Sequence, residues 1–428
     1  MRIVSNYVRM ACTFAIGIYI MRRLLSIDPS LFAVYTLLTV GLGVGMMIRE
    51  ALRMALVPFL RQHIKPDGSI TSSQFQQSLT LTTIFALANT SLYFFIAHMG
   101  SLFNISATYA DQFKDFVFLR GIGYSFIIIC VPFLNLLANE YRMISYNCWL
   151  LAERVLDVVV IETIIRALHD NSTQPLVSGG IAYLVCTFFL MCLLILIRKF
   201  TSREGISIKP KLITKTNYRY FLKRIRSSGL LVVTMAMYFR FSLVIINIVF
   251  GEALAISYAI AVQVSSYLRQ ITMGLITGLD SYFARKSADR TKNLMAKEVN
   301  KKALSSAIFL FLVFLTFIIF LRPLVQFLTQ GSDINIESVL IFSTFFLCGV
   351  FIRATSETWM QFLSGLGKVN LYSTKVFCVA VISQAYVLIL SQFSLNEPEY
   401  YIGAGFFAAM FVSHWLIVPI ALKKANAD

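Results

Sequence analysis

Three charged residues lie inside a long apolar stretch near the N-terminus of this 428-residue chain. Residues 31–60 form an apolar run that contains Arg49, Glu50 and Arg53. A helix needs only about 20 residues to cross the hydrocarbon core of a bilayer, so these side chains are predicted to lie at membrane depth. An arginine there costs roughly 2.5–3.5 kcal/mol, and it therefore usually faces a partner, a bound ion or a water-filled cavity.

Other charged residues in the apolar segments differ in whether the nearby sequence offers a partner. Three pairs of opposite charge stand three or four positions apart and can neutralise each other on one helix face. These pairs are Arg154 with Asp157, Glu162 with Arg166, and Arg353 with Glu357. Arg240 and Arg269 have no acidic residue within four positions, and Arg49 and Arg53 have only Glu50 between them. Arg120 has no acid at helical spacing, but it lies near the predicted outer boundary, where its side chain can reach the interface.

Guanidinium groups in a membrane cavity favour an anionic ligand, because their planar fork matches phosphate oxygens in geometry. We therefore predict an anion site. Its candidate residues are Arg49, Arg53, Arg240, Arg269, Arg120 and Arg353. Three acidic residues are candidates for coupling Na⁺ or H⁺, since a carboxylate in the membrane can act as an ion or proton relay. They are Glu50, Asp280 and Glu357, and the alternative for Glu50 is that it serves as the counter-ion of Arg53.

The composition excludes a soluble globular protein. Hydrophobic residues make up 57% and charged residues 14% of the chain, whereas a soluble domain has about 25% charged residues. The apolar segments predict an all-α integral membrane protein with twelve transmembrane helices. The predicted spans are residues 7–25, 31–60, 75–99, 116–137, 144–168, 177–197, 227–250, 253–283, 304–328, 339–363, 372–395 and 402–422.

The net charge of +17 is interpreted as a topology signal. The lysines and arginines gather in alternate loops, as expected of cytoplasmic loops, so both termini are predicted to be cytoplasmic and nucleic acid is not an expected partner. The seven cysteines and four histidines show no paired metal-ligand or disulfide spacing, and no metal or cofactor is predicted. The N-terminal run lacks a small-residue cleavage site and is expected to remain as the first helix.

The two halves of the chain show signs of duplication. Tyr35 aligns with Tyr258 and Arg142 with Lys368, at offsets of 223 and 226 residues. We predict an N-terminal six-helix bundle over residues 1–198, a basic linker over 199–226 and a C-terminal bundle over 227–428. Six helices per repeat make the repeats parallel, an arrangement that places a substrate site near the midplane between them. The linker is expected to lie as an amphipathic segment on anionic lipid.

Two segments resemble a known family. RRLLSIDPSLFAVYTLLTVGLGVGMMIREALR, residues 22–53, resembles the opening of the polysaccharide-flippase branch of the multidrug/oligosaccharidyl-lipid/polysaccharide exporter (MOP) superfamily. It has an R-x-L element at the end of the first helix and an R-E-A-x-R element in the second. YAIAVQVSSYLRQITMGLITGLDSYFARKSADR, residues 258–290, resembles the eighth helix of that family and the loop after it.

The resemblance implies a V-shaped pair of six-helix bundles like those of the multidrug (MATE) transporters of this superfamily. It also implies a cationic central cavity at Arg49, Arg53, Arg240 and Arg269. The expected function is to flip an undecaprenyl-pyrophosphate-linked oligosaccharide, such as an O-antigen unit of lipopolysaccharide, across the inner membrane by alternating access. Membrane lipid, a polysaccharide polymerase and chain-length proteins are the other expected partners.

Two alternatives remain open. One is a multidrug or cation antiporter of the same superfamily, which should have a cavity of net negative charge. The other is a membrane polysaccharide polymerase or glycosyltransferase. The predicted outer loops are short, whereas such an enzyme needs a catalytic surface outside the bilayer, and we therefore expect a non-enzyme.

Overall fold

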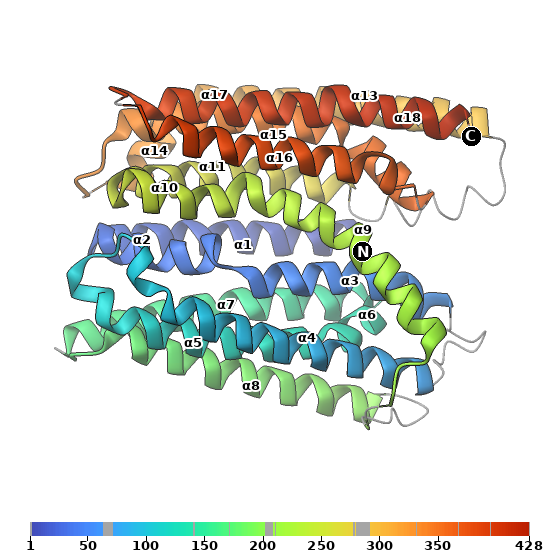
Figure 1. Cartoon of the computed structure of the whole chain (residues 1–428), viewed down its shortest axis with the longest axis horizontal. Coiled ribbons are helices and arrows are strands. Elements are labelled where there is room, and N and C mark those ends of the chain that lie inside the picture. The colour runs from blue at the N-terminus through green and yellow to red at the C-terminus, as the bar shows by residue number, and fades with distance from the viewer. Residues whose placement is uncertain are drawn as a thin grey trace. The chain divides into compact units, whose positions relative to one another are not determined.

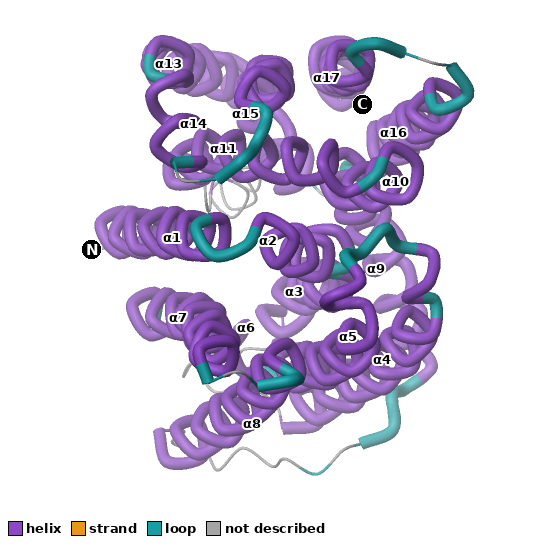
Figure 2. The backbone as a smooth tube through the Cα atoms, turned by 90° about the vertical axis from the view of Figure 1, so that its left-hand side faces the viewer, coloured by secondary structure: helices purple, strands orange, loops and turns teal. Residues whose placement is uncertain are grey.

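The computed structural model describes residues 2–62, 72–139, 142–170, 172–201, 209, 211–276, 279, 292–330, 332–366, 368–393 and 395–427. Among these residues the chain forms helices and loops and no strand (Figures 1 and 2). It divides into two compact units. Unit 1 comprises residues 1–16 and 43–232, and unit 2 comprises residues 17–42 and 233–428.

Unit 1 is built from the first part of α1 (Arg2–Leu25) and a series of helices up to the start of α9. These are α3 (Val44–Gln62), α4 (Ser72–His98), η2 (Gly100–Leu102), α5 (Ala107–Ile129), α6 (Val131–Asn139), α7 (Met143–His169), α8 (Pro175–Thr201) and α9 (Lys215–Ala236). Helix α5 packs on α4 and α8, α7 packs on α8, and α3 packs on α6. Close packing of α5 on α4 requires glycine at position 121, because a Cβ there would lie 2.3 Å from the Tyr93 side chain of α4.

Unit 2 holds the end of α1, the two elements that follow it, the end of α9 and every element after α9. These are α2 (Pro29–Thr36), η1 (Leu37–Gly41), η3 (Met237–Phe241), α10 (Ser242–Phe250), α11 (Glu252–Ile276), α13 (Lys292–Ile319), α14 (Leu321–Thr329), α15 (Ile336–Gly365), α16 (Asn370–Leu390), α17 (Pro398–Phe411), η4 (Val412–Ile417) and α18 (Val418–Ala427). Helix α15 is central, since it packs on α11, α13 and α17. Asp28 caps α2 by accepting a hydrogen bond from the Ser30 backbone nitrogen at 2.8 Å, and Pro29 occupies the first turn.

The compact units differ from the predicted domain boundaries in the assignment of residues 17–42. The sequence placed this segment in the N-terminal bundle, but α2 packs on α11 and η1 packs on α10 and η3, which groups it with unit 2. Both η1 and η3 are π-helical, as is η4. Such wide turns inside α-helices often occur at functional sites.

Nine helices within the described residues are long and apolar enough to cross a membrane, or ten if the pair α5 and α6, bent by 42°, counts as one span. The predicted number of twelve is therefore not confirmed. The two other predicted spans correspond to α7 and α11, which have 27 and 25 residues. At 1.5 Å per residue these helices are about 40 and 37 Å long, which is long enough to span. Helix α7 is not counted among the nine because it carries five charged residues, three of which, Glu153, Arg154 and Asp157, belong to the site described next.

Candidate functional site

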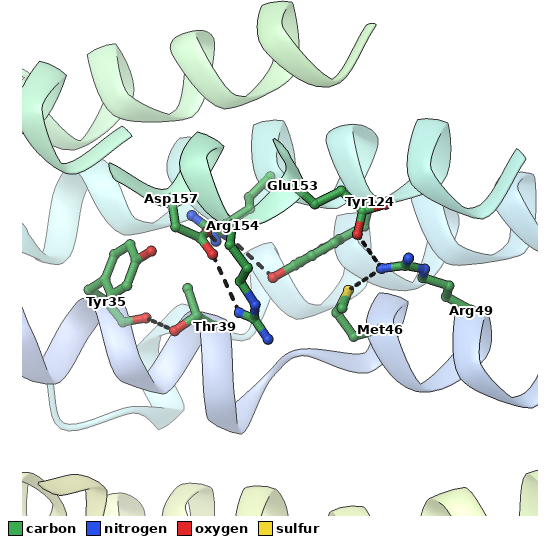
Figure 3. Close-up of polar contacts among 9 residues, drawn as sticks. Tyr35, Thr39, Met46, Arg49, Tyr124, Glu153, Arg154 and Asp157 are labelled. Carbon is green, nitrogen blue, oxygen red and sulfur yellow. Dashed lines mark hydrogen bonds and ion pairs between the residues drawn. The ribbon is translucent and has the colours of Figure 1, made fainter. Parts of the chain in front are cut away.

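A buried ion pair joins α3 and α7 in unit 1 (Figure 3). Arg49 Nη1 donates to Glu153 Oε2 at 2.6 Å, and the two side chains are only 7% and 9% exposed. Trp149 Nε1 donates to the other carboxylate oxygen at 2.8 Å. Local spacing offered only Glu50 as a carboxylate for Arg49, and Glu50 alone was therefore predicted as its partner. This was wrong, because the tertiary packing brings Glu153, 104 positions away, into contact with the guanidinium.

A second buried pair joins α5 and α7. Arg120 Nη2 donates to Asp157 Oδ1 at 2.7 Å, and the Arg120 side chain is 2% exposed. Its guanidinium carbon lies 4.3 Å from the centroid of the Tyr183 ring, which is within the range of a cation–π contact. Arg120 has no acid at helical spacing on α5, as predicted, but α7 supplies the partner, and the enclosed side chain does not reach the interface.

More exposed charges surround these pairs. Arg53 Nε donates to Glu50 Oε2 at 2.9 Å, and these side chains are 38% and 44% exposed. Arg154 lies 3.5 Å from Asp157, which confirms the predicted pair, but Arg154 is 51% exposed and Arg120 is the nearer partner of that carboxylate.

Arg9 of α1 completes the group. It interacts electrostatically with Arg49, Arg53 and Arg154, and its Nε atom is buried without a hydrogen-bond partner in the structure. We call the connected set the unit 1 charge cluster. Its members are Arg9, Arg49, Arg53, Arg120, Arg154, Glu50, Glu153 and Asp157.

The unit 1 charge cluster has five guanidinium groups and three carboxylates, and hence a net charge of +2 at neutral pH. Its buried pairs hold α3, α5 and α7 together, because removing one partner would leave a charge without compensation. Its accessible charge is carried by Arg53 and Arg154, with Arg9 beside them. The arrangement can therefore accept an anion at the exposed arginines while the buried pairs keep the helices in place.

Unit 2 contains a separate polar group on α15. Arg353 Nε lies 3.4 Å from Glu357 Oε2, which confirms the predicted pair, and both side chains are less than one-tenth exposed. The Ser356 hydroxyl, one helical turn after Arg353, lies 3.1 Å from His414 Nδ1 in η4. His414 Nε2 and Arg353 Nη1 are buried, and neither has a hydrogen-bond partner among the described residues. Arg353 and Glu357 are thus both enclosed. The observed role of Glu357 is that of counter-ion to Arg353.

Two of the other predicted site residues, Arg240 and Arg269, belong to unit 2. Arg240 lies in η3 and Arg269 in α11, and both are half-buried. Asp280 lies outside the described residues. Glu50 contacts Arg53, as in the alternative interpretation of that residue. Within the described parts of the chain, no three His, Cys, Asp or Glu side chains come close enough to hold a metal ion.

Sequence reasoning missed two members of the unit 1 charge cluster. Glu153 stands beside Arg154 in a predicted span, and its position at membrane depth was a signal that it needed a cationic partner. Arg9 was not among the predicted site residues, yet it lies close enough to Arg49, Arg53 and Arg154 to interact with them electrostatically. The groups with which these two residues interact lie on other helices.

Comparisons with known proteins identify the fold. No protein-family model matches the chain, and no curated protein matches it. Solved structures match it over nearly its whole length. One is an inward-facing multidrug resistance MATE family transporter of the MOP superfamily, with a TM-score of 0.75, 13% identity and 99% of both chains covered.

Two further structures cover all of this chain at 13% identity. A MOP superfamily transporter from Pyrococcus furiosus, described as having a binding pocket of reverse polarity, has a TM-score of 0.72 and is covered over 96% of its own length. The eukaryotic MATE transporter AtDTX14 has a TM-score of 0.66 and is covered over 99%. The chain therefore has the all-helical fold of the MATE transporters of the MOP superfamily.

Proposed function

We propose that this protein is a membrane transporter that moves a polyprenyl-diphosphate-linked oligosaccharide from the cytoplasmic to the outer leaflet of the inner membrane by alternating access. The observation that supports this most directly is the net positive charge of the unit 1 charge cluster at membrane depth. Its exposed arginines are in our proposal the groups that contact the diphosphate.

The chemistry of the cluster suits such a headgroup. Arginine binds phosphate oxygens through two parallel hydrogen bonds, and these charge-assisted bonds are stronger than neutral ones. Arg53 and Arg154 are 38% and 51% exposed, so each can contact a ligand without unfolding its surroundings. Arg240 and Arg269 are half-buried in unit 2, and we propose that they also contact the anionic substrate.

The membrane potential supplies a driving force for this direction of transport. Moving a negative charge outward across a membrane that is negative inside gains roughly 2.3 kcal/mol per charge for each 100 mV. A diphosphate with about two charges thus gains enough to drive accumulation by the potential alone. Coupling to Na⁺ or H⁺ through Glu50, Asp280 or Glu357 stays a prediction.

A multidrug antiporter is the second candidate, because structures of multidrug resistance MATE transporters share this fold. An exporter of organic cations needs acidic groups in excess of basic ones at its binding site. The unit 1 charge cluster has the opposite balance, which favours an anionic substrate. The similar structures are those of transporters, which fits a non-enzyme over the polymerase or glycosyltransferase alternative.

Proteoliposomes test the proposal. The purified chain is reconstituted with a fluorescent undecaprenyl-diphosphate oligosaccharide in one leaflet, and the fraction that becomes accessible to a membrane-impermeant quencher is followed with time. The wild type should transfer this lipid faster than protein-free vesicles. Arg53→Gln combined with Arg154→Gln should slow the transfer by on the order of 100-fold, since each charged hydrogen bond contributes about 1.5–3 kcal/mol.

A matched control variant removes the same number of positive charges at positions outside the cluster. Lys297→Gln combined with Lys301→Gln removes two exposed cations from α13 and should leave transfer unchanged. Equal transfer by the wild type and the arginine variant would contradict the proposal. Export of ethidium by the wild type, without lipid transfer, would support the multidrug candidate.

A further inference from the structure

An apolar groove lies in unit 1 between α4 and the segment that leads into α9. It has a volume of about 440 Å³ and is lined from α4 by Ile84 and Phe85 and from the other side by Leu212, Tyr218, Leu222 and Ile225. Leu212 is 89% exposed, and Ile84, Tyr218 and Leu222 are each more than half exposed. Large apolar side chains so exposed need a partner other than water, because burying each of them gains roughly 1.5–3 kcal/mol.

The groove is held in a fixed form by hydrogen bonds between its two walls. The Thr80 hydroxyl of α4 donates to the Lys211 carbonyl at 2.9 Å and accepts from the Lys211 nitrogen at 3.0 Å. Gln77 Oε1 accepts from the Thr214 nitrogen at 3.1 Å and from Asn217 Nδ2 at 2.8 Å. The groove is thus a built feature of unit 1 and does not arise from a loosely placed linker.

Helix α9 is anchored in the core of unit 1 through Phe221, which also lines the groove. The ring of Phe221 packs edge-on against that of Phe59, with 4.6 Å between centroids, and Tyr220 lies 5.6 Å from the same ring. This contact sets the rotation of α9 about its axis. Tyr218, Leu222 and Ile225 therefore face the groove.

A row of cations runs beside the apolar row of α9. Lys215, Arg219, Lys223 and Arg226 are all exposed, and they recur at intervals of four, four and three residues. Since Arg219, Lys223 and Arg226 each follow a groove-lining residue, they stand one helical step of 100° from it. No acidic residue occurs between positions 205 and 251. The groove is consequently bordered by a row of exposed cations, and the sequence of α9 contains no carboxylate.

We propose that this groove binds one anionic phospholipid, with an acyl chain against Ile84, Leu222 and Ile225 and the headgroup phosphate on the cations of α9. Charge complementarity selects this occupant, because a segment rich in lysine and arginine beside a membrane attracts anionic lipids by about 1 kcal/mol per residue. The position also fits a lipid: α4 is a membrane-spanning candidate from Ser73 to His98, so Ile84 and Phe85 lie at the depth of the acyl chains. The binding is independent of the transported substrate.

Native mass spectrometry of the purified full chain tests the proposal, with dioleoyl phosphatidylglycerol as the anionic probe and dioleoyl phosphatidylcholine as the neutral one. The wild type should bind one phosphatidylglycerol in preference to phosphatidylcholine. The triple variant Lys215→Gln, Arg219→Gln and Lys223→Gln should bind phosphatidylglycerol on the order of 100-fold more weakly.

The control variant Lys297→Gln, Lys301→Gln and Lys424→Gln loses the same three charges from other exposed positions and should keep the wild-type affinity. An equal loss in both variants would mean general attraction to charge and would overturn the proposal.

A second variant examines the groove without altering the charge. Ile84→Trp places a larger side chain, an indole ring, in the groove. Position 84 is 54% exposed, so the substitution does not disturb the core. It should weaken phosphatidylglycerol binding about tenfold by displacing the acyl chain. Wild-type affinity in this variant would refute the groove as the binding site. Tighter binding of undecaprenyl phosphate than of phosphatidylglycerol would replace the phospholipid by a polyprenyl lipid and would equally overturn the proposal.

Discussion

Neutralising Glu153 tests the buried pair on which the unit 1 charge cluster depends. In the Glu153→Gln variant the side chain keeps its shape and an oxygen that can still accept from Trp149 Nε1, now 2.8 Å from the carboxylate. Only the negative charge is lost. Arg49, which is 7% exposed, then stays in the interior without its nearest counter-ion.

The expected cost follows from the burial of both partners. Removing one partner of a buried ion pair typically destabilises a protein by about 3–5 kcal/mol. Glu50 also interacts with Arg49, so we expect the lower end, about 3 kcal/mol. For a unit of roughly 200 residues, 1 kcal/mol shifts Tm by about 2–4 °C, so the variant should unfold roughly 6–12 °C below the wild type.

The assay is thermal unfolding of the purified chain in one detergent, with two comparison variants. Adding Arg49→Met to Glu153→Gln removes the stranded charge and should restore most of the lost Tm, since apolar replacement of a buried pair is often neutral. Arg154→Gln affects a half-exposed pair and should lower Tm by less than about 3 °C. If Glu153→Gln unfolds at the wild-type temperature, or if Arg49→Met does not rescue it, the buried pair does not hold α3 to α7.

Three further predictions concern other parts of the chain. Gly121→Ala should lower the stability of unit 1 by about 1–3 kcal/mol, because the new Cβ meets Tyr93 at 2.3 Å; an unchanged chemical denaturation curve would contradict this. Burial raises the pKa of Glu252 above its unfolded value of about 4.3, so protonation stabilises unit 2 at low pH and the gain is lost as the pH rises through the raised pKa. Glu252→Gln should accordingly flatten the dependence of Tm on pH, and an equally steep profile would refute this effect of Glu252. Gln77→Ala removes the three hydrogen bonds that Thr214 and Asn217 donate at the start of α9 and should speed tryptic cleavage after Lys211, whereas equal cleavage rates would show that these bonds do not fix the groove.

The helices and the local pairs were within reach of sequence reasoning. Apolar runs of spanning length predicted the all-α fold, because length and hydropathy act within one segment. The same holds for Arg353 and Glu357, whose spacing on one helix face brings them together in the structure.

Partners on different helices were not predictable in this way. Arg49 meets Glu153 and Arg120 meets Asp157 only after α3, α5 and α7 have packed, and nothing in the local spacing selects these carboxylates over others. The π-helical turns η1, η3 and η4 have no sequence pattern that we could read in advance. Residues 17–42 were assigned to the first half by position, whereas their contacts place them in unit 2.

The central claim, that a cationic cluster selects an anionic lipid-linked substrate, is tested most directly by equilibrium binding. The Kd of the purified chain for an undecaprenyl-diphosphate oligosaccharide should rise on the order of 100-fold when Arg53→Gln and Arg154→Gln are combined, while the Tm stays close to that of the wild type. The wild type should also bind this lipid more tightly than it binds ethidium. An unchanged Kd in the double variant, or tighter binding of ethidium, would contradict the account.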